Sequence, residues 1–499
     1  MTAASITLSF ASVALFAGQV SPVTPVAATA DELTLDWPAR TILSMETDGV
    51  ETVMRFDRAP DAVSLEAFRR DAGTDLIRMD WNDTSMVIRP APGRTFVPNL
   101  KGTRLSIRIV RDAPPGADMA TEPVDYSLAR AAAESASGYP GRARKMLLTL
   151  ARSLPDDPQL IRTMADMDAS RGATLRAARH YRALDAADAY ARRTIRAAGG
   201  EVAAIVAARD GGGFAQIEAS VRATVPVAAA RNGLDTVIGG AIRQVRTRAD
   251  AVVARDGGIR TLRRPVTLAE VMGSIGDATT RLELLGAGNL SRTRIGLAAR
   301  LLRGPAEREW RLAAAYHLPD VLTAEQVLLG GYVDRWGGGV TWRSSPAMQV
   351  QGDIVRTSYG LAREGILATS TVVTGGVDAT VRRLNPALTL SYRLEAEYVD
   401  RLDRRVNGPA ALSLADRENH TVQALVAEQR GPWRLVAAAG WTFDRFGGNG
   451  PTGALTVAGF IGDAWQAEAT GGVSSIRRPN LVGTQLFARV ALRRSMGRL

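Results

Sequence analysis

Residues 388–398 read LTLSYRLEAEY and decide the fold, because their side chains alternate strictly between apolar and polar. A β-strand sends successive side chains to opposite faces, so Leu390 and Leu394 fall on one face and Arg393 and Glu395 on the other. An α-helix would mix both kinds of side chain around its surface. The stretch therefore predicts a long strand with one apolar and one charged face.

The same period-two texture extends from residue 211 to the end of the chain. Residues 292–302, 308–318 and 433–443 alternate in the same way, and clusters rich in Gly, Pro and Asn separate such stretches. A barrel in a membrane requires strands of this kind, with lipid outside, water inside and every backbone group paired. We therefore expect a C-terminal transmembrane antiparallel β-barrel of about sixteen strands over 211–499. A large soluble β-sandwich or solenoid would also alternate.

Aromatic residues support the membrane interpretation. Tryptophans that lie at or near expected strand ends would form an interfacial girdle. They are Trp336, Trp342, Trp433, Trp441 and Trp465.

The polar parity of these strands indicates which side chains line a water-filled lumen. The candidates are Arg292, Arg294, Arg300, Arg311, Arg343, Arg393, Glu395, Glu397 and Arg434. With Glu309 and Asp444 added, the lumen would hold seven arginines and four carboxylates. A lumen of that sign concentrates anions, so the expected cargo is neutral or acidic rather than cationic.

The N-terminal residues 1–30 have the character of a secretory signal peptide. An apolar stretch over 6–16 is too short to span a bilayer, and the small residues Ala28 and Ala30 precede Asp31. This pattern predicts cleavage after Ala30. No later segment offers about 18 consecutive apolar residues, so no transmembrane helix is expected.

Residues 31–115 predict a small β-rich domain with one helix. Short strand-like runs such as 53–56 and 105–109 are separated by turns, and a helical segment lies near 65–70. The order of short strands, the RFDRAP turn of 55–60, a helix and further strands resembles periplasmic envelope-binding domains of the AMIN type. The segment 112–116, DAPPG, reads as a linker.

Residues 125–200 are rich in alanine and contain a repeat. Small residues recur with a spacing of 34 positions and would let two helices approach closely. They are Ala131, Gly138 and Ala143 in one copy and Ala165, Gly172 and Ala177 in the other. The pattern resembles a tetratricopeptide (TPR) repeat. An ordinary helical hairpin with chance spacing is the alternative, and two copies are few for a free-standing solenoid.

The chemistry-bearing residues do not predict an enzyme. The chain has no cysteine and three histidines, His180, His317 and His420, none with metal-ligand spacing. We expect no catalytic residue, no metal site and no cofactor. The net charge is +11, and apart from Lys101 and Lys145 every basic residue is arginine. These arginines are spread along the chain without interleaved aromatics, so nucleic acid is not an expected partner.

The order of signal peptide, helical repeats and C-terminal barrel resembles the outer-membrane porins of exopolysaccharide export. That resemblance, to PelB-like, BcsC-like and PgaA-like exporters, rests on the spacing of Gly138 and Gly172 and on the alternating series after residue 211. It implies a multidomain protein of the bacterial outer membrane with its N-terminal domains in the periplasm, and a role in biofilm formation. The barrel would pass a neutral or acidic polysaccharide, and the repeats would dock polymer or periplasmic proteins of the synthesis complex. A general or solute-selective porin and a soluble periplasmic scaffold are the alternatives.

Overall fold

The computed structural model describes residues 32–111 and 124–497. Within these ranges it leaves out 42, 48–50, 92–93, 187, 228–233, 278, 292–293, 320–323, 384, 406–407 and 477–482. The predicted signal peptide, the linker 112–116 and Arg292 therefore lie outside the described residues.

The first part of the chain is a small α+β region with two sheets. One sheet has the order β1-β7-β6 and the other β2-β3-β5-β4. The strands are β1 (Glu32–Asp36), β2 (Leu43–Thr47), β3 (Thr52–Phe56), β4 (Leu76–Trp81), β5 (Ser85–Pro90), β6 (Arg94–Lys101) and β7 (Arg104–Arg111). Helix α1 (Ala62–Ala72) begins at Asp61, whose carboxylate accepts a hydrogen bond from the Ser64 amide, and the short 3-10 helix η2 (Gly73–Asp75) follows it. Phe68 of α1 is buried in the apolar core between the sheets, in one cluster with Met86.

Five helices follow. They are α2 (Val124–Ala136), α3 (Pro140–Ser153), α4 (Pro158–Ser170), α5 (Thr174–Ala183) and α6 (Ala189–Ala197). Gly138 and Gly172 occupy equivalent turns, α2–α3 and α4–α5, and both have positive φ, 83° and 74°. The four alanines of the expected repeat are buried at helix contacts, and they are Ala131, Ala143, Ala165 and Ala177. Their assignment to the TPR family stays a prediction.

The rest of the chain closes into a barrel. Among the described residues, sixteen antiparallel strands pair in sequence, and β23 returns to pair with β8. The strands are β8 (Glu201–Gly211), β9 (Phe214–Val227), β10 (Asp235–Val253), β11 (Ile259–Gly276), β12 (Thr280–Asn289), β13 (Arg294–Arg303), β14 (Arg308–Pro319), β15 (Gly331–Ser345), β16 (Met348–Leu361), β17 (Gly365–Arg382), β18 (Ala387–Leu402), β19 (Arg417–Arg430), β20 (Trp433–Asp444), β21 (Asn449–Ile461), β22 (Trp465–Ser474) and β23 (Gln485–Ser495). The predicted barrel of about sixteen strands is confirmed. The barrel begins at Glu201, ten residues before the predicted boundary at 211. The prediction missed β8 because this alanine-rich strand shares the composition of the helices before it.

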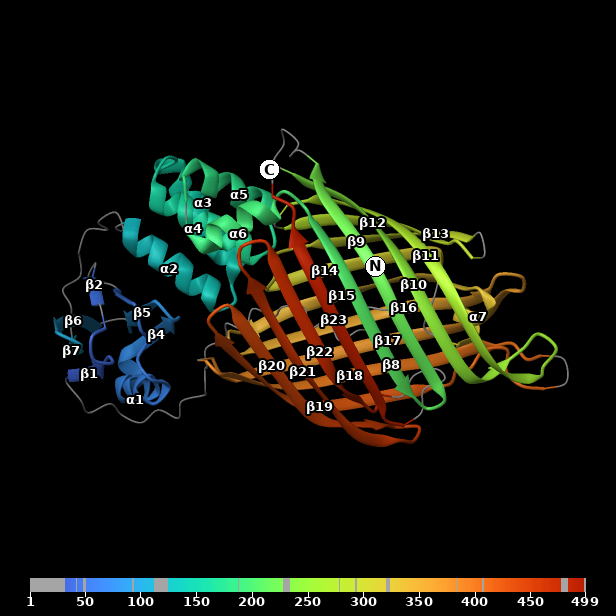
Figure 1. The fold of residues 1–499 in the computed structure, drawn as a ribbon. Coiled ribbons are helices and arrows are strands. Elements are labelled where there is room, and N and C mark those ends of the chain that lie inside the picture. Colours follow the sequence, from blue (N-terminus) through green and yellow to red (C-terminus); the bar gives the residue numbers. More distant parts are fainter. Residues whose placement is uncertain are drawn as a thin grey trace.

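The two ends of the barrel differ. At the near rim, where α6 leads into β8 and β23 ends, the helical layer α2–α6 lies against the barrel (Figure 1). At the far rim, helix α7 (Ala324–Leu329) lies in the long connection between β14 and β15. The longest connection, 403–416, is also at the far rim, whereas 346–347 and 431–432 at the near rim are tight turns.

The outward face of the barrel is apolar and carries aromatic residues at two levels. Large exposed side chains in the middle of the strands include Leu297, Leu312 and Leu455. Exposed tryptophans gather toward the near rim, and they are Trp310, Trp342, Trp433 and Trp465. Toward the far rim the exposed aromatics are Tyr316, Tyr398, Trp441 and Phe443. Trp336, predicted near a strand end, lies well inside β15.

Irregular pairing and internal packing break the alternation of apolar and polar faces, as β14 and β10 show. In β14 the pairing with β15 shifts between Ala315 and Leu318, and His317 has a φ of 51°. This β-bulge turns Leu318 from the expected outward face into the interior, where it is buried. In the far halves of β10 and β11 the faces are reversed, with Val245 and Leu268 buried inside. The predicted outward face of Leu318 was wrong because a bulge overrides a period of two, and in β10 and β11 internal packing does the same.

Candidate functional site

The barrel encloses a cavity of about 2460 Å³ that extends to the helical layer at the near rim. Its wall is made by the inward side chains of the strands and by the inner faces of α2, α4 and α6, which contribute residues such as Ala131, Thr163 and Tyr190. The helical layer and the lumen therefore bound one continuous space.

The structure places most of the predicted lumen residues on this cavity. They are Arg300, Arg311, Arg343, Arg393, Glu395, Glu397 and Arg434. Arg294 shares the inward parity of Arg300 but lies toward the far rim. Its guanidinium lies 4.3 Å from the ring centroid of Tyr332, and Nη2 donates to the carbonyl of Ala362 at 2.8 Å. Arg292 lies outside the described residues.

Most charges of the lumen wall occur in cross-strand pairs. Arg311 pairs with Asp353 at 2.9 Å and Arg393 with Asp378 at 2.7 Å. Arg243 lies between Glu218 and Glu270, at 3.6 and 3.3 Å. Among the described residues, fourteen arginines and ten carboxylates line the cavity, a surplus of four positive charges. The wall is therefore a dense array of hydrogen-bonding groups with a modest positive bias.

Several charged residues of the cavity wall were not among those predicted from the sequence. They are Glu218, Arg243, Glu270, Asp353, Asp378, Arg417, Glu468 and Arg489. Alternation could have found those on regular strands such as β16 and β22. In β10 it could not, because Arg243 and Val245 share one face while Ile242 and Arg246 share the other.

A buried ionic network forms the wall between β16 and β19. The Glu397 carboxylate accepts hydrogen bonds from Tyr359 Oη at 2.5 Å and Ser370 Oγ at 2.7 Å. Arg417 bridges it to Glu395, at 3.0 and 2.6 Å. Glu397 and Arg417 are buried, so their partners are needed to offset the free-energy cost of burying charge.

Part of the far half of the lumen, on the side of β9 to β17, is filled with protein. Val327 and Leu328 of α7 pack against the inward faces of β9, β10 and β11. Ala411 and Leu412 of the 403–416 connection pack in an apolar cluster with inward residues of β12 to β17. The two inserts meet where Ser413 Oγ donates to Glu325 at 2.6 Å. We call α7 and residues 410–414 the far plug.

The helical layer is fastened to the near rim by polar contacts. The Gly141 amide donates to Glu307 on the β13–β14 turn at 3.2 Å, and a Cβ at Gly141 would collide with that side chain. Arg192 pairs with Asp463 on the β21–β22 turn at 2.9 Å. Arg343 packs against Gly138, where a Cβ would lie 2.7 Å from the guanidinium. These contacts hold the helices at a defined position over the lumen.

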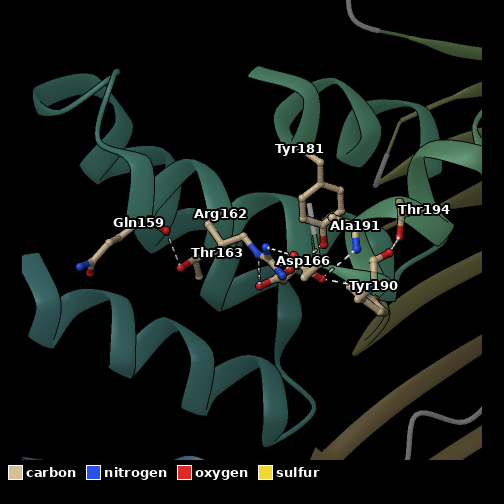
Figure 2. A network of polar contacts seen from close by, with 9 residues as sticks. Gln159, Arg162, Thr163, Asp166, Tyr181, Tyr190, Ala191 and Thr194 are labelled. Atoms are coloured by element: carbon tan, nitrogen blue, oxygen red, sulfur yellow. Dashed lines mark hydrogen bonds and ion pairs between the residues drawn. The ribbon is translucent and has the colours of Figure 1, made fainter. Parts of the chain in front are cut away.

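Figure 2 shows the polar network that joins α4, α5 and α6 beside the cavity. Arg162 pairs with Asp166 at 3.0 Å and with Asp188 at 2.6 Å, and Tyr181 Oη donates to Asp166 at 2.5 Å. The hydrogen bond from Arg162 and the amide bonds at the start of α6 lower the pKa of Asp188 to about 2. Burial and the bond to Asp166 raise the pKa of Tyr181. The network therefore fixes the orientation of α6 and of Tyr190.

In the part of the chain that the structure describes, no group of three His, Asp or Glu side chains could hold a metal ion. None of the described helices has the length and apolar character needed to cross a membrane.

No protein-family model and no curated protein matches the chain. Several solved structures are similar in fold over the barrel. A bacterial polysaccharide outer membrane secretin has 11% identity and a TM-score of 0.42, over 60% of this chain and 98% of that one. An anion-selective porin from Comamonas acidovorans has 9% identity and a TM-score of 0.33, over 59% and 97%. A mutant porin of Rhodopseudomonas blastica has 11% identity and a TM-score of 0.31, over 59% and 98%. Likenesses this weak carry no argument about function, and the barrel rests on its own strand pairing.

Proposed function

We propose that this chain is an outer-membrane channel that exports a polysaccharide from the periplasm to the cell surface. The observation that carries the proposal is the single cavity shared by the barrel lumen and the inner faces of α2, α4 and α6. A chain that enters the barrel must first pass the helical layer. Such an antechamber suits a long polymer that is handed over by periplasmic proteins better than a small diffusing solute.

The membrane location is supported by the outer surface of the barrel. An apolar belt between two levels of exposed aromatic residues is what a bilayer requires of a barrel. A soluble periplasmic scaffold would expose this belt to water, which disfavours that alternative. The near rim has the tight turns, and short turns lie on the periplasmic side of outer-membrane barrels. We therefore place the near rim and the N-terminal regions in the periplasm.

A general or solute-selective porin is the second candidate. The surplus of positive charge on the lumen wall favours it, because a positively biased lumen attracts small anions. The far plug disfavours it, because a porin that serves diffusion keeps an open aqueous path.

The test measures secreted and periplasmic polysaccharide in a host strain that carries this gene and in its deletion strain. Deletion of the gene is expected to move polymer from the medium to the periplasm, and the full-length chain is expected to restore secretion. A barrel that lacks residues 32–198 is expected to insert but to restore little secretion. Liposome swelling with monosaccharides separates the second candidate: fast swelling with undisturbed polymer secretion in the deletion strain would establish a general porin and overturn the exporter.

A further inference from the structure

Two aromatic rings stand exposed on the wall of the near-rim cavity. Tyr190 at the start of α6 is 44% exposed, and Phe460 at the end of β21 is 39% exposed. Both line the cavity and neither belongs to the outward aromatic levels. Exposed rings on a concave polar wall provide flat apolar platforms.

Arg193 lies beside the ring of Phe460. It is three residues after Tyr190 on α6, so the two side chains share one face of the helix. Its guanidinium lies 4.6 Å from the ring centroid of Phe460, and its Nε donates to the carbonyl of Ala189 at 3.0 Å. The two terminal nitrogens of Arg193 make no hydrogen bond to any residue that the structure describes. They present a planar pair of donors beside the ring of Phe460 and on the helix face that carries Tyr190.

The site is held rigid by its surroundings. Tyr190 packs edge-on against Tyr181, with ring centroids 6.4 Å apart, and Tyr181 is held by Asp166 (Figure 2). Asp188 caps the helix that carries Tyr190 and Arg193. The neighbouring Arg192 is already engaged with Asp463. The rings and the guanidinium are thus positioned before any ligand arrives, which reduces the entropy lost on binding.

We propose that Tyr190, Arg193 and Phe460 form a binding site for a carboxylate-bearing sugar unit of a polysaccharide. The aromatic faces would stack on the C–H face of a pyranose ring, and the terminal nitrogens of Arg193 would bind its carboxylate in a bidentate pair. This inference rests on the proposed function and narrows its cargo to an acidic polymer. The site lies where the polymer would pass from the helical layer into the barrel.

The test is direct binding to the full-length protein in detergent micelles. The probes are a fluorescent uronic-acid hexamer and a neutral glucose hexamer, followed by anisotropy. The uronate is expected to bind more tightly than the neutral hexamer. Tyr190→Ala and Phe460→Ala are each expected to weaken uronate binding about tenfold, and Arg193→Gln is expected to remove the preference for the uronate.

The chain contains a matched control. At the far rim Arg445 lies over the ring of Phe446 at 5.8 Å, an arginine–phenylalanine pair outside the cavity. Phe446→Ala and Arg445→Gln are expected to bind uronate like the unchanged protein. Equal binding of both hexamers, equal binding by all variants, or displacement of the uronate by equimolar inorganic phosphate would overturn the inference.

The two proposals fail separately. A chain that restores secretion without binding the uronate overturns the acidic-sugar site and leaves the exporter standing. A chain that binds the uronate but restores no secretion overturns the exporter. The shift in electrophoretic mobility between unheated and boiled samples shows that each variant is folded.

Discussion

At the scale of single residues, the lumen wall shows how charge is tolerated inside a barrel. Arg417 and Glu397 are almost fully buried, and each is matched by partners within 3.1 Å. Arg300 is a different case, because its side chain is 36% exposed and its nearest carboxylate, that of Glu283, is 3.8 Å away. The same residue type is therefore integral to the packing at one position and solvated at another.

This difference predicts unequal effects of the same substitution. Arg417→Met leaves Glu395 and Glu397 uncompensated and is expected to lower the free energy of unfolding by about 3–5 kcal/mol. Arg300→Met, the control, is expected to lower it by less than about 1 kcal/mol. Urea unfolding of the detergent-solubilised protein, followed by tryptophan fluorescence, measures both. Equal losses would contradict the role given to the buried network.

Asp188 predicts how the helical layer responds to acid. Its pKa is lowered to about 2 by Arg162 and the α6 amides. Its stabilising contribution is therefore complete above the unfolded pKa near 4 and is lost as the pH falls toward 2. Helical circular dichroism is expected to decline over that interval, and Asp188→Asn is expected to weaken the helices already at pH 7. Asp156→Asn, in the turn between α3 and α4, serves as the control, and identical acid profiles for both variants would refute the assignment.

At the scale of elements, alternation predicts a strand and its faces only where the strand is regular. In β18 and β20 the predicted faces agree with the structure, since Leu390 and Trp441 are exposed and Arg393 and Arg434 line the cavity. In β14 the bulge at His317 reverses the pattern, and no local sequence feature announces it. Where a strand is irregular, contacts between distant segments decide which side chains face the interior.

The far plug, the reversed faces of β10 and the cross-strand ion pairs were beyond prediction for the same reason. Each depends on residues far apart in the chain, such as Glu325 and Ser413 or Arg311 and Asp353. A pattern read along one strand contains neither the register of its neighbours nor the segment that fills the interior. The lumen candidates could be predicted from regular strands, whereas the site around Arg193 needs the helix and the barrel together.

Adjacent positions on β21 test the faces of a strand. Leu455 is 51% exposed on the outward face, and Thr456 lines the cavity, where it hydrogen-bonds Thr470 at 3.0 Å. Leu455→Arg is expected to destabilise the folded barrel in lipid by about 2–4 kcal/mol, because the charge would lie near the middle of the bilayer. Thr456→Arg is expected to be far better tolerated. Folding yields in liposomes, measured by the gel shift on heating, would disprove the membrane assignment if both variants behaved alike.

At the scale of the whole molecule, a helical layer at one end and the far plug at the other enclose a polar cavity. The surplus of positive charge predicts anion selectivity once the path is open. A variant with residues 408–414 replaced by a shorter Gly-Ser segment is expected to conduct more than the full chain in planar bilayers. Its reversal potential under a KCl gradient is expected to favour chloride. A cation preference would contradict the charge assignment of the wall.

If a polysaccharide leaves through this barrel, as we propose, the far plug must move during export. The chain has no cysteine, which permits a cross-link at one chosen place. Glu325→Cys and Ser413→Cys, combined and joined by a short bis-maleimide, would tie α7 to the 403–416 connection where the two side chains meet. We predict that secretion stops in the cross-linked double variant and continues in either single variant given the same reagent. Undiminished secretion from fully cross-linked protein would show that the polymer does not leave past the far plug of this barrel.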